Sequence, residues 1–272
     1  MPQLLLSLLF ALIIAFLAYR AHSLSRSGAY AAVLVGTLIF GLGGWQWAII
    51  LLTFFISSSV LTRLFGKRKA ALNEKFEKGG QRDAAQVLAN GAVASLFAGL
   101  HFFFPQANWP WLAFAASMAA VNADTWATEL GVSNPTPPRL ITSGKPVDKG
   151  TSGAISFYGT LAALAGAALI AILAAALNPI AQPSLFTYHL LLISLSGLLG
   201  ALFDSLLGAS VQAIYRCPQC DKETERHPVH TCGAQTTQIR GWKWLNNDMV
   251  NLACALMGVV VTLVFMWAGI AG

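Results

Sequence analysis

The chain has few charged residues. Only 10% of its 272 residues are Asp, Glu, Lys or Arg, whereas 56% are hydrophobic and the mean hydropathy is +0.62. Soluble globular domains carry about a quarter charged residues, so this composition excludes an ordinary soluble domain. It is typical of a protein that crosses a membrane several times. We predict an all-α membrane protein that forms a single domain over residues 1–272.

Basic residues are missing from three connections between apolar runs, at residues 41–44, 105–108 and 178–188. Runs of about 17 or more mostly apolar residues can cross a bilayer as helices. They predict a bundle of about eight transmembrane helices, at roughly 3–19, 28–44, 45–64, 86–104, 109–128, 153–177, 188–213 and 248–270. The second and third helices share one apolar stretch, which the turn signal Gly41-Leu42-Gly43-Gly44 divides.

All 17 Lys and Arg fall into four clusters, at residues 20–26, 63–82, 139–149 and 216–243. With eight helices these clusters share one side of the membrane, which the positive-inside rule makes cytoplasmic. Both termini are then extracytoplasmic, and the cytoplasmic loops cover about 65–85, 131–152 and 214–247. Because the positive charge is divided among loops, nucleic acid is a poor candidate partner. The lipid bilayer and phosphorylated compounds suit this face better.

Acidic residues are also scarce, and two of them follow directly after an apolar run. The sequence there is Asn122-Ala123-Asp124-Thr125-Trp126-Ala127-Thr128-Glu129. On a helix, Asn122, Thr125 and Glu129 form one stripe, and Asp124 and Thr128 form a second stripe beside it. Ionisable groups at such a depth are costly and usually face a protein interior or a wet cavity.

Two further carboxylates lie in the last two predicted helices. Helix packing accounts for Gly200 and Gly208 but not for Asp204 between them, since a lone buried carboxylate is protonated or pairs with a metal or an arginine. Asp248 precedes the last apolar run. Mg²⁺ is commonly held by one or two carboxylates together with substrate phosphates. We therefore predict a catalytic Mg²⁺ site from the acidic residues Asp124, Glu129, Asp204 and Asp248.

Small polar and basic residues gather in the loop before the sixth predicted helix, where Lys149-Gly150-Thr151-Ser152-Gly153 leads directly into the apolar run. A helix N-terminus with free N–H groups binds phosphates well. The loop is not a Walker A motif, and its glycines and prolines could instead only shape a turn. The predicted phosphate- and nucleotide-binding residues are Asn122, Thr125, Arg139, Ser143, Gly144, Lys149, Gly150, Thr151, Ser152, Gly153, Asn247 and Asn251, with Lys145 as a catalytic cation.

A polar stripe also begins the fourth predicted helix, where Arg82, Gln86 and Asn90 recur every fourth residue. Lipid contact would be costly for these side chains. They either face the substrate or, for Gln86 and Asn90, form buried hydrogen bonds between helices.

The chain has only four cysteines, and three of them lie in one predicted cytoplasmic loop with two histidines. A reducing compartment disfavours disulfides. Cys217, Cys220, His230 and Cys232 could bind a structural Zn²⁺, or the loop could hold free thiols. His227 has the more usual spacing from Cys232, and Cys254 is an apolar residue of the last helix.

No Ser-His-Asp or catalytic cysteine arrangement stands out. Four motifs, at residues 122–129, 142–153, 200–209 and 244–251, resemble those of the integral-membrane family that includes phytyl-phosphate kinase and the transmembrane protein 19-like proteins. The resemblance covers essentially the whole chain. It implies a kinase that transfers the terminal phosphoryl group of a nucleoside triphosphate, CTP or ATP, to an isoprenoid monophosphate such as phytyl phosphate.

Two other functions stay open. A cytidylyltransferase that forms a CDP-lipid would use similar groups. An ion-coupled transporter is less favoured, since transporters bind near the midplane and the polar residues here collect at one face. We expect an integral protein of a bacterial inner membrane or of a plastid-type membrane, with its active site on the cytoplasmic face.

Overall fold

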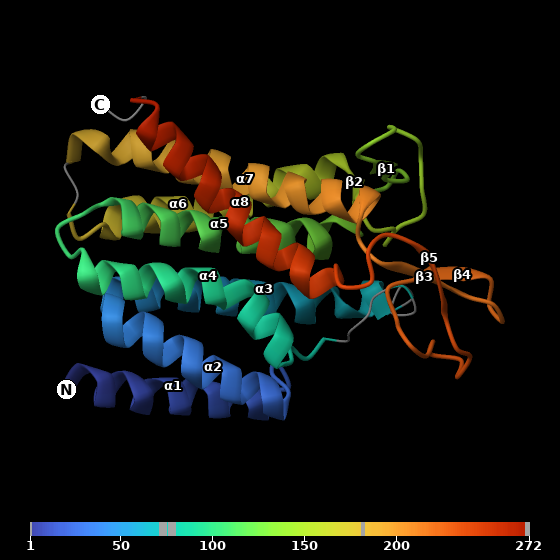
Figure 1. Ribbon diagram of the computed structural model, residues 1–272, viewed down its shortest axis with the longest axis horizontal. Coiled ribbons are helices and arrows are strands. Elements are labelled where there is room, and N and C mark those ends of the chain that lie inside the picture. The colour runs from blue at the N-terminus through green and yellow to red at the C-terminus, as the bar shows by residue number, and fades with distance from the viewer. Residues whose placement is uncertain (1, 71–74, 76–79, 181–182, 270–272) are drawn as a thin grey trace.

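The computed structural model describes residues 2–70, 75, 80–180 and 183–269. Its long helices within these ranges are α1 (Pro2–Arg20), α2 (Arg26–Leu38), α3 (Trp45–Ala70), α4 (Ala84–Phe103), α5 (Trp109–Gly131), α6 (Phe157–Leu177), α7 (Phe186–Ser210) and α8 (Asn247–Trp267). The prediction of an all-α bundle with eight helices is confirmed (Figure 1). Seven of these helices, all except α5, are long and apolar enough to cross a membrane, α2 only together with the helical turn that continues it to Gly43.

The predicted break between the second and third helices is also confirmed. A π-helical turn, Ile39–Gly43, extends α2, and α3 begins at Trp45. Gly44 between them has a φ of +93°, a backbone conformation that glycine adopts without steric cost. Residues 71–74 and 76–79 of the predicted loop 65–85, and residue 270 at the predicted end of the last helix, lie outside the described residues.

Some helix boundaries differ from the prediction. α3 continues to Ala70 rather than ending near 64, because a helix can extend past its last apolar residue into water. The sixth helix begins at Phe157 rather than at 153, where the Ser156 hydroxyl accepts a hydrogen bond from the Gly159 N–H and caps the helix. α7 spans Phe186–Ser210 instead of 188–213.

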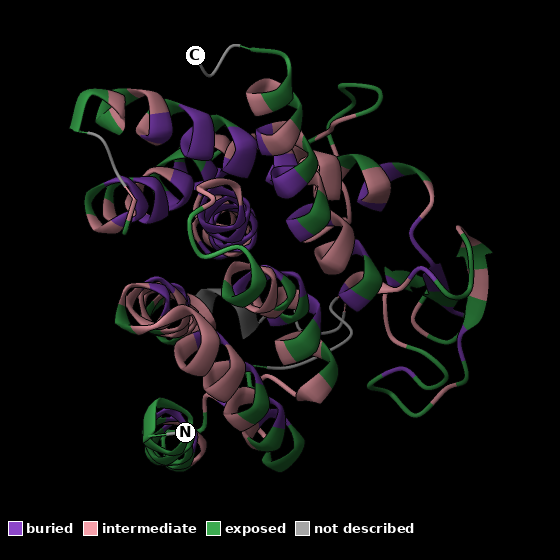
Figure 2. Cartoon of the chain, turned by 60° about the vertical axis from the view of Figure 1, so that its left-hand side comes forward, coloured by how far each residue is buried: buried purple, intermediate pink, exposed green. Residues whose placement is uncertain are grey.

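Helix α5 lies at the centre of the bundle and packs against α3, α4, α6, α7 and α8. Its residues from Pro110 to Ala123 are buried without a break. Figure 2 shows the buried residues gathered inside the bundle and exposed residues along the outer helices. Because protein rather than lipid surrounds α5, this helix can carry polar side chains that an outer helix could not.

Two glycines bring the neighbouring helices close to α5. A Cβ atom on Gly200 of α7 would lie 2.6 Å from the Ala120 Cβ, and one on Gly258 of α8 would lie 2.8 Å from the Ala116 carbonyl oxygen. Small residues at helix contacts allow such approach within membranes. Close backbone packing therefore holds α7 and α8 against α5.

The outer surface of the bundle is apolar. Leu5, Phe16 and Leu17 of α1 are each more than half exposed. Exposed apolar area on this scale is unusual for a soluble monomer, and it fits contact with lipid tails.

Two small sheets, which the sequence did not predict, lie at one end of the bundle (Figure 1). Strand β1 (Arg139–Leu140) pairs antiparallel with β2 (Ala154–Ile155). Strands β3 (Ile214–Cys217), β4 (Lys222–Thr224) and β5 (Thr237–Arg240) form an antiparallel sheet with the order β4-β3-β5. Strands of two to four residues are too short to show alternating hydrophobicity. α1 begins and α8 ends at the opposite end of the bundle.

Candidate functional site

A polar pocket of about 400 Å³ lies at the end of the bundle that carries the small sheets. Helices α3, α5 and α7 end beside it, and α4, α6 and α8 begin there. The volume is within the range of sites that bind small molecules. Its polar lining includes most of the predicted site, namely Arg82, Gln86, Asn90, Asp124, Thr125, Glu129, Lys149, Thr151, Ser152, Asp204, Asn247 and Asn251.

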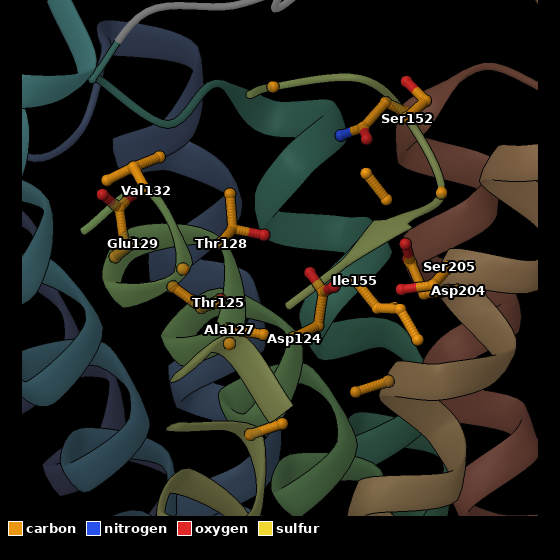
Figure 3. A pocket seen from close by; sticks show the side chains of 18 of the residues that line it. Asp124, Thr125, Ala127, Thr128, Glu129, Val132, Ser152, Ile155, Asp204 and Ser205 are labelled. Carbon is orange, nitrogen blue, oxygen red and sulfur yellow. The ribbon is translucent and has the colours of Figure 1, made fainter. Parts of the chain in front are cut away.

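Two carboxylates from different helices meet in this pocket. Asp124 projects from α5 and Asp204 from α7, with Ser205 beside Asp204 (Figure 3). The two carboxylates are close enough to repel each other electrostatically. Asp204 Oδ2 is buried and makes no hydrogen bond with any residue that the structure describes. A buried carboxylate oxygen in this position is stabilised by a cation or a proton.

Glu129 lies apart from this pair, on the side of the pocket formed by α3. Its Oε1 accepts a hydrogen bond from the Thr62 hydroxyl at 3.0 Å. The two positions on α5 are separated by five residues, which turns their side chains about 140° apart on a helix. The pocket therefore has two acidic regions rather than the single four-carboxylate site that the sequence predicted.

Arg82 is a cationic side chain of this pocket that could bind a phosphate. Its guanidinium group lies 5.6 Å from the ring centres of both Phe54 and Phe55, and Nη1 donates to the Ser59 hydroxyl at 3.2 Å. Burial lowers the pKa of Arg82 to about 10, and the negative charge of Glu129 opposes this change. The side chain therefore remains positively charged at neutral pH.

Local hydrogen bonds hold the start of α4 at the pocket. The Asp83 carboxylate accepts from the Gln86 N–H, and the Gln86 side chain accepts from the Asp83 N–H. This reciprocal pair is a capping box. The side-chain oxygen of Gln86 is therefore used to cap α4, while Gln86 also lines the pocket. Asn90, one turn further along α4, also lines the pocket.

The loop at 149–153 lines the pocket, but it is not the helix N-terminus that the sequence predicted. Strand β2 and the capping Ser156 separate it from α6. The Lys149 ammonium group donates to the carbonyl oxygens of Val132 and Asn134, just after α5. Gly153 has a φ of +80°, and a Cβ atom there would lie 2.2 Å from the Ala209 N. The loop is thus held tightly between the ends of α5 and α7.

Several predicted site residues lie elsewhere. Arg139 is exposed and donates to the Gly144 carbonyl oxygen. Ser143, Gly144 and Lys145 are also exposed, at the tip of the same turn, and none of them is part of the described lining. Their exposed positions outside the described lining do not support the predicted phosphate-binding and catalytic roles.

Asn122 and Asp248 are buried and do not belong to the described lining of the pocket. The Asn122 amide group donates to the Gly166 carbonyl oxygen at 2.8 Å, and its Oδ1 accepts from the Ser57 hydroxyl at 3.1 Å. These bonds join α5 to α6 and α3, which gives Asn122 a structural role. Asp248 lies in the first turn of α8, while Asn247 and Asn251 of the same helix do reach the pocket.

Gln212 and Glu225 are among the pocket residues that sequence reasoning missed. The Glu225 carboxylate accepts hydrogen bonds from Ser152 Oγ at 2.7 Å and from Gln212 Nε2 at 3.0 Å. It also acts electrostatically on Asp204. Glu225 is 73 positions from Ser152 in the chain, so no local pattern indicates this contact.

The predicted zinc ligands form a separate cluster in and beside the β4-β3-β5 sheet. One ligand atom from each of Cys217, Cys220, His230 and Cys232 lies within 4.8 Å of the others. His227, the alternative histidine, stacks on the Tyr215 ring at 4.4 Å instead.

These features define an integral membrane protein with a polar pocket among the ends of its helices. The chain belongs to the integral membrane protein family DUF92, whose model matches residues 9–259. This confirms the family that the four sequence motifs indicated.

Relatives of known sequence cover nearly the whole chain. The chain is 31% identical to Protein PGR of Arabidopsis thaliana over 96% of its length and 95% of that protein. It is 33% identical to the uncharacterized membrane protein MJ0933 of Methanocaldococcus jannaschii over 95% of the chain and 92% of the relative. It is 28% identical to Protein VTE6, chloroplastic, of Arabidopsis thaliana over 88% of the chain and 64% of that protein. No solved structure matches the chain.

Proposed function

We propose that this protein is a membrane-embedded isoprenyl-phosphate kinase. It transfers the terminal phosphoryl group of CTP or ATP to a prenyl monophosphate such as phytyl phosphate. The observation that carries this proposal is the meeting of Asp124 and Asp204 in one polar pocket at the end of a bundle of apolar helices. Membership of the DUF92 family and the four motifs support it.

The residues of the pocket fit a divalent cation. Asp124 and Asp204 offer carboxylate oxygens, which Mg²⁺ prefers, and Asp204 Oδ2 is buried without a hydrogen-bond partner among the described residues. These two side chains would hold the ion, with Glu225 nearby. When bound, Mg²⁺ would offset the negative charge of the nucleotide phosphates and of the group in transfer.

Two features of the protein would position the phosphates. Helices α6 and α8, whose caps Ser156 and Asn246 are uncharged, begin at the pocket, so their N-terminal ends direct partial positive charge toward it. Arg82 lies beside α3, near Glu129, and stays charged at neutral pH. We assign Arg82 to the acceptor phosphate and the 149–153 loop to the nucleotide.

The reaction then needs little covalent chemistry from the protein. An oxygen of the prenyl monophosphate attacks the terminal phosphorus of the nucleotide, the bond from that phosphorus to its bridging oxygen breaks, and a nucleoside diphosphate leaves. A phosphate monoester is largely ionised at neutral pH, with a second pKa near 6, so this acceptor needs no general base. The prenyl tail can stay in the bilayer beside the apolar helices.

An assay of the purified protein in detergent tests this function. Phytyl, farnesyl and geranylgeranyl monophosphates would each be incubated with CTP or ATP and Mg²⁺. The proposal expects a prenyl diphosphate and a nucleoside diphosphate in equal amounts. Release of pyrophosphate with a CDP-lipid would identify the alternative cytidylyltransferase, and the absence of any nucleotide turnover with all three acceptors would refute both enzymes.

A further inference from the structure

A second candidate site lies outside the pocket, at the Cys217, Cys220, His230 and Cys232 cluster. The Cys217 and Cys232 sulfur atoms are 3.5 Å apart, and His230 Nδ1 is 3.2 Å from the Cys232 sulfur. Sulfur ligands about 2.3 Å from a tetrahedral zinc ion stand about 3.8 Å from each other. The spacing of these donors is therefore close to that of a closed tetrahedral site.

Two chain reversals of the same kind bring the four donors together. The first joins β3 to β4, where Cys217 pairs with Lys222 and Asp221 has a φ of +50°. In the second, the Gly233 N–H donates to the His230 carbonyl oxygen, and Gly233 has a φ of +89°. Each left-handed residue directly follows a cysteine. Each reversal therefore presents two donors on one side of a tight turn.

We propose that these four side chains bind one structural Zn²⁺ ion. Three thiolates and one imidazole form a complete tetrahedral set, which leaves no position for a substrate. Cys217 is fully buried and His230 is 3% exposed, whereas Cys220 is half-buried and Cys232 is exposed. The ion would therefore be covered on one side by the sheet and lie near the surface on the other. This site is independent of the pocket and of the function proposed for it.

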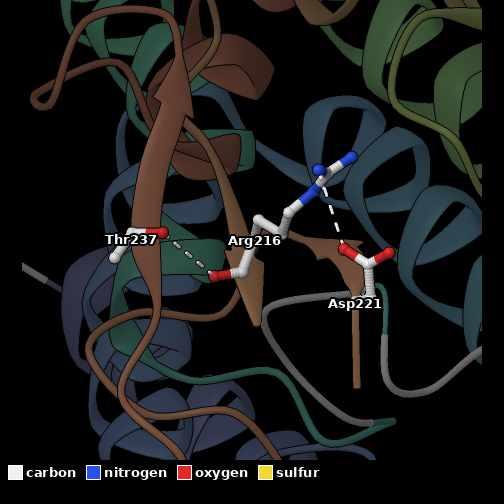
Figure 4. A network of polar contacts seen from close by, with 3 residues as sticks. All are labelled: Arg216, Asp221 and Thr237. Atoms are coloured by element: carbon white, nitrogen blue, oxygen red, sulfur yellow. Dashed lines mark hydrogen bonds and ion pairs between the residues drawn. The ribbon is translucent and has the colours of Figure 1, made fainter. Parts of the chain in front are cut away.

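The small size of this sheet fits a stabilising role for the metal. Its strands have only three or four residues. Figure 4 shows two of its polar contacts, in which Arg216 Nη1 lies 3.6 Å from Asp221 Oδ1 and the Thr237 hydroxyl donates to the Arg216 carbonyl oxygen. The two charged side chains are 50% and 84% exposed, and exposed ion pairs contribute little stability. A bound metal supplies folding energy that such a small sheet lacks.

The proposed ion lies at the end of the sheet that the bundle does not hold. At the near end, the Arg240 guanidinium group donates to the carbonyl oxygens of Gly208 and Ala209, at the end of α7. Arg240 pairs with Ile214 at the start of β3, and Cys217 is the last residue of that strand. The zinc ion would thus fix the outer half of the sheet, from which β4 leads directly into Glu225 at the pocket.

Metal analysis of the purified full-length protein tests this proposal. Inductively coupled plasma mass spectrometry should find about one zinc per chain in the native protein and in the control variant Cys254→Ser, which removes the buried cysteine of α8. Cys220→Ser should lose at least three quarters of this zinc. Native protein without zinc, or a Cys220→Ser variant that retains all of it, would overturn the proposal.

A second measurement covers the case in which Cys220→Ser does not fold. Zinc K-edge X-ray absorption of the native protein should show three sulfur ligands near 2.3 Å and one nitrogen ligand near 2.0–2.1 Å. A first shell of oxygen and nitrogen only would mean adventitious binding, and it would refute the assignment.

Discussion

The substitution Asp204→Asn separates a metal-binding role from a packing role. Asparagine keeps the size of the side chain and removes its charge. In the native protein, Asp204 Oδ2 is buried without a hydrogen-bond partner among the described residues, and the charges of Asp124 and Glu225 repel the carboxylate. Without a bound cation this carboxylate is therefore a destabilising group, and with one it is a ligand.

If Asp204 binds the metal, the substitution should lower the reaction rate without lowering the stability of the metal-free protein. Loss of one of two carboxylate ligands weakens stabilisation of the transferring phosphoryl group by about 3 kcal/mol, which corresponds to a rate decrease of roughly 100-fold. The metal-free protein should keep its stability or gain about 1 kcal/mol, because a buried and unsatisfied charge is removed. In a chain of this size that gain would raise the melting temperature by about 2 °C.

The assay combines kinase rates with melting curves in detergent, with and without Mg²⁺. Native protein should melt at a higher temperature when Mg²⁺ is added, because a ligand that binds only the folded state stabilises it. Asp204→Asn should lose this increase. Asp221→Asn is the matched control, since Asp221 is exposed and lies outside the pocket. An Asp204→Asn protein with native rates and a native response to Mg²⁺ would refute the reasoning.

Three further substitutions test separate parts of the structure. Asn122→Ala should lower the free energy of unfolding by about 2–3 kcal/mol, measured by thermal melting, because it removes a buried hydrogen bond to α6 and a partly buried one to α3. Unchanged melting would contradict its structural role. Arg82→Gln should raise the KM for the prenyl phosphate at least tenfold across pH 6–9. The native side chain, with a pKa of about 10, stays charged over this range. An effect on the nucleotide KM alone would assign Arg82 to the nucleotide instead of the acceptor phosphate. Glu225→Gln keeps an acceptor for Ser152 but removes a charge near Asp204. It should therefore weaken Mg²⁺ binding roughly tenfold in a titration. Unaltered affinity would place Glu225 outside the metal's surroundings.

Composition and periodicity were sufficient to predict the helices, because each helix that contacts lipid must satisfy its backbone hydrogen bonds within its own segment. That requirement leaves a long apolar run in the sequence, and the glycines at 41–44 mark where one run is divided. The acidic residues of α5 and α7 were recognisable for a related reason. Asp124 and Asp204 interrupt apolar runs, and a charge within such a run needs a special environment.

Tertiary contacts decided which polar residues share the pocket. Asn122 and Asp124 are two positions apart and look alike in the sequence, yet Asn122 is used to join three helices and only Asp124 reaches the pocket. Lys145 and Lys149 look equally suitable as phosphate ligands in the sequence. In the structure Lys149 lines the pocket, whereas Lys145 is exposed and outside the described lining.

Glu225 joins the pocket through a contact with a residue 73 positions away, and Cys217 meets Cys232 across two turns. Such contacts depend on how the elements pack in space. Residue type and local spacing determine which elements form, whereas the neighbours of each polar side chain are set by the packing of helices that are distant in the chain.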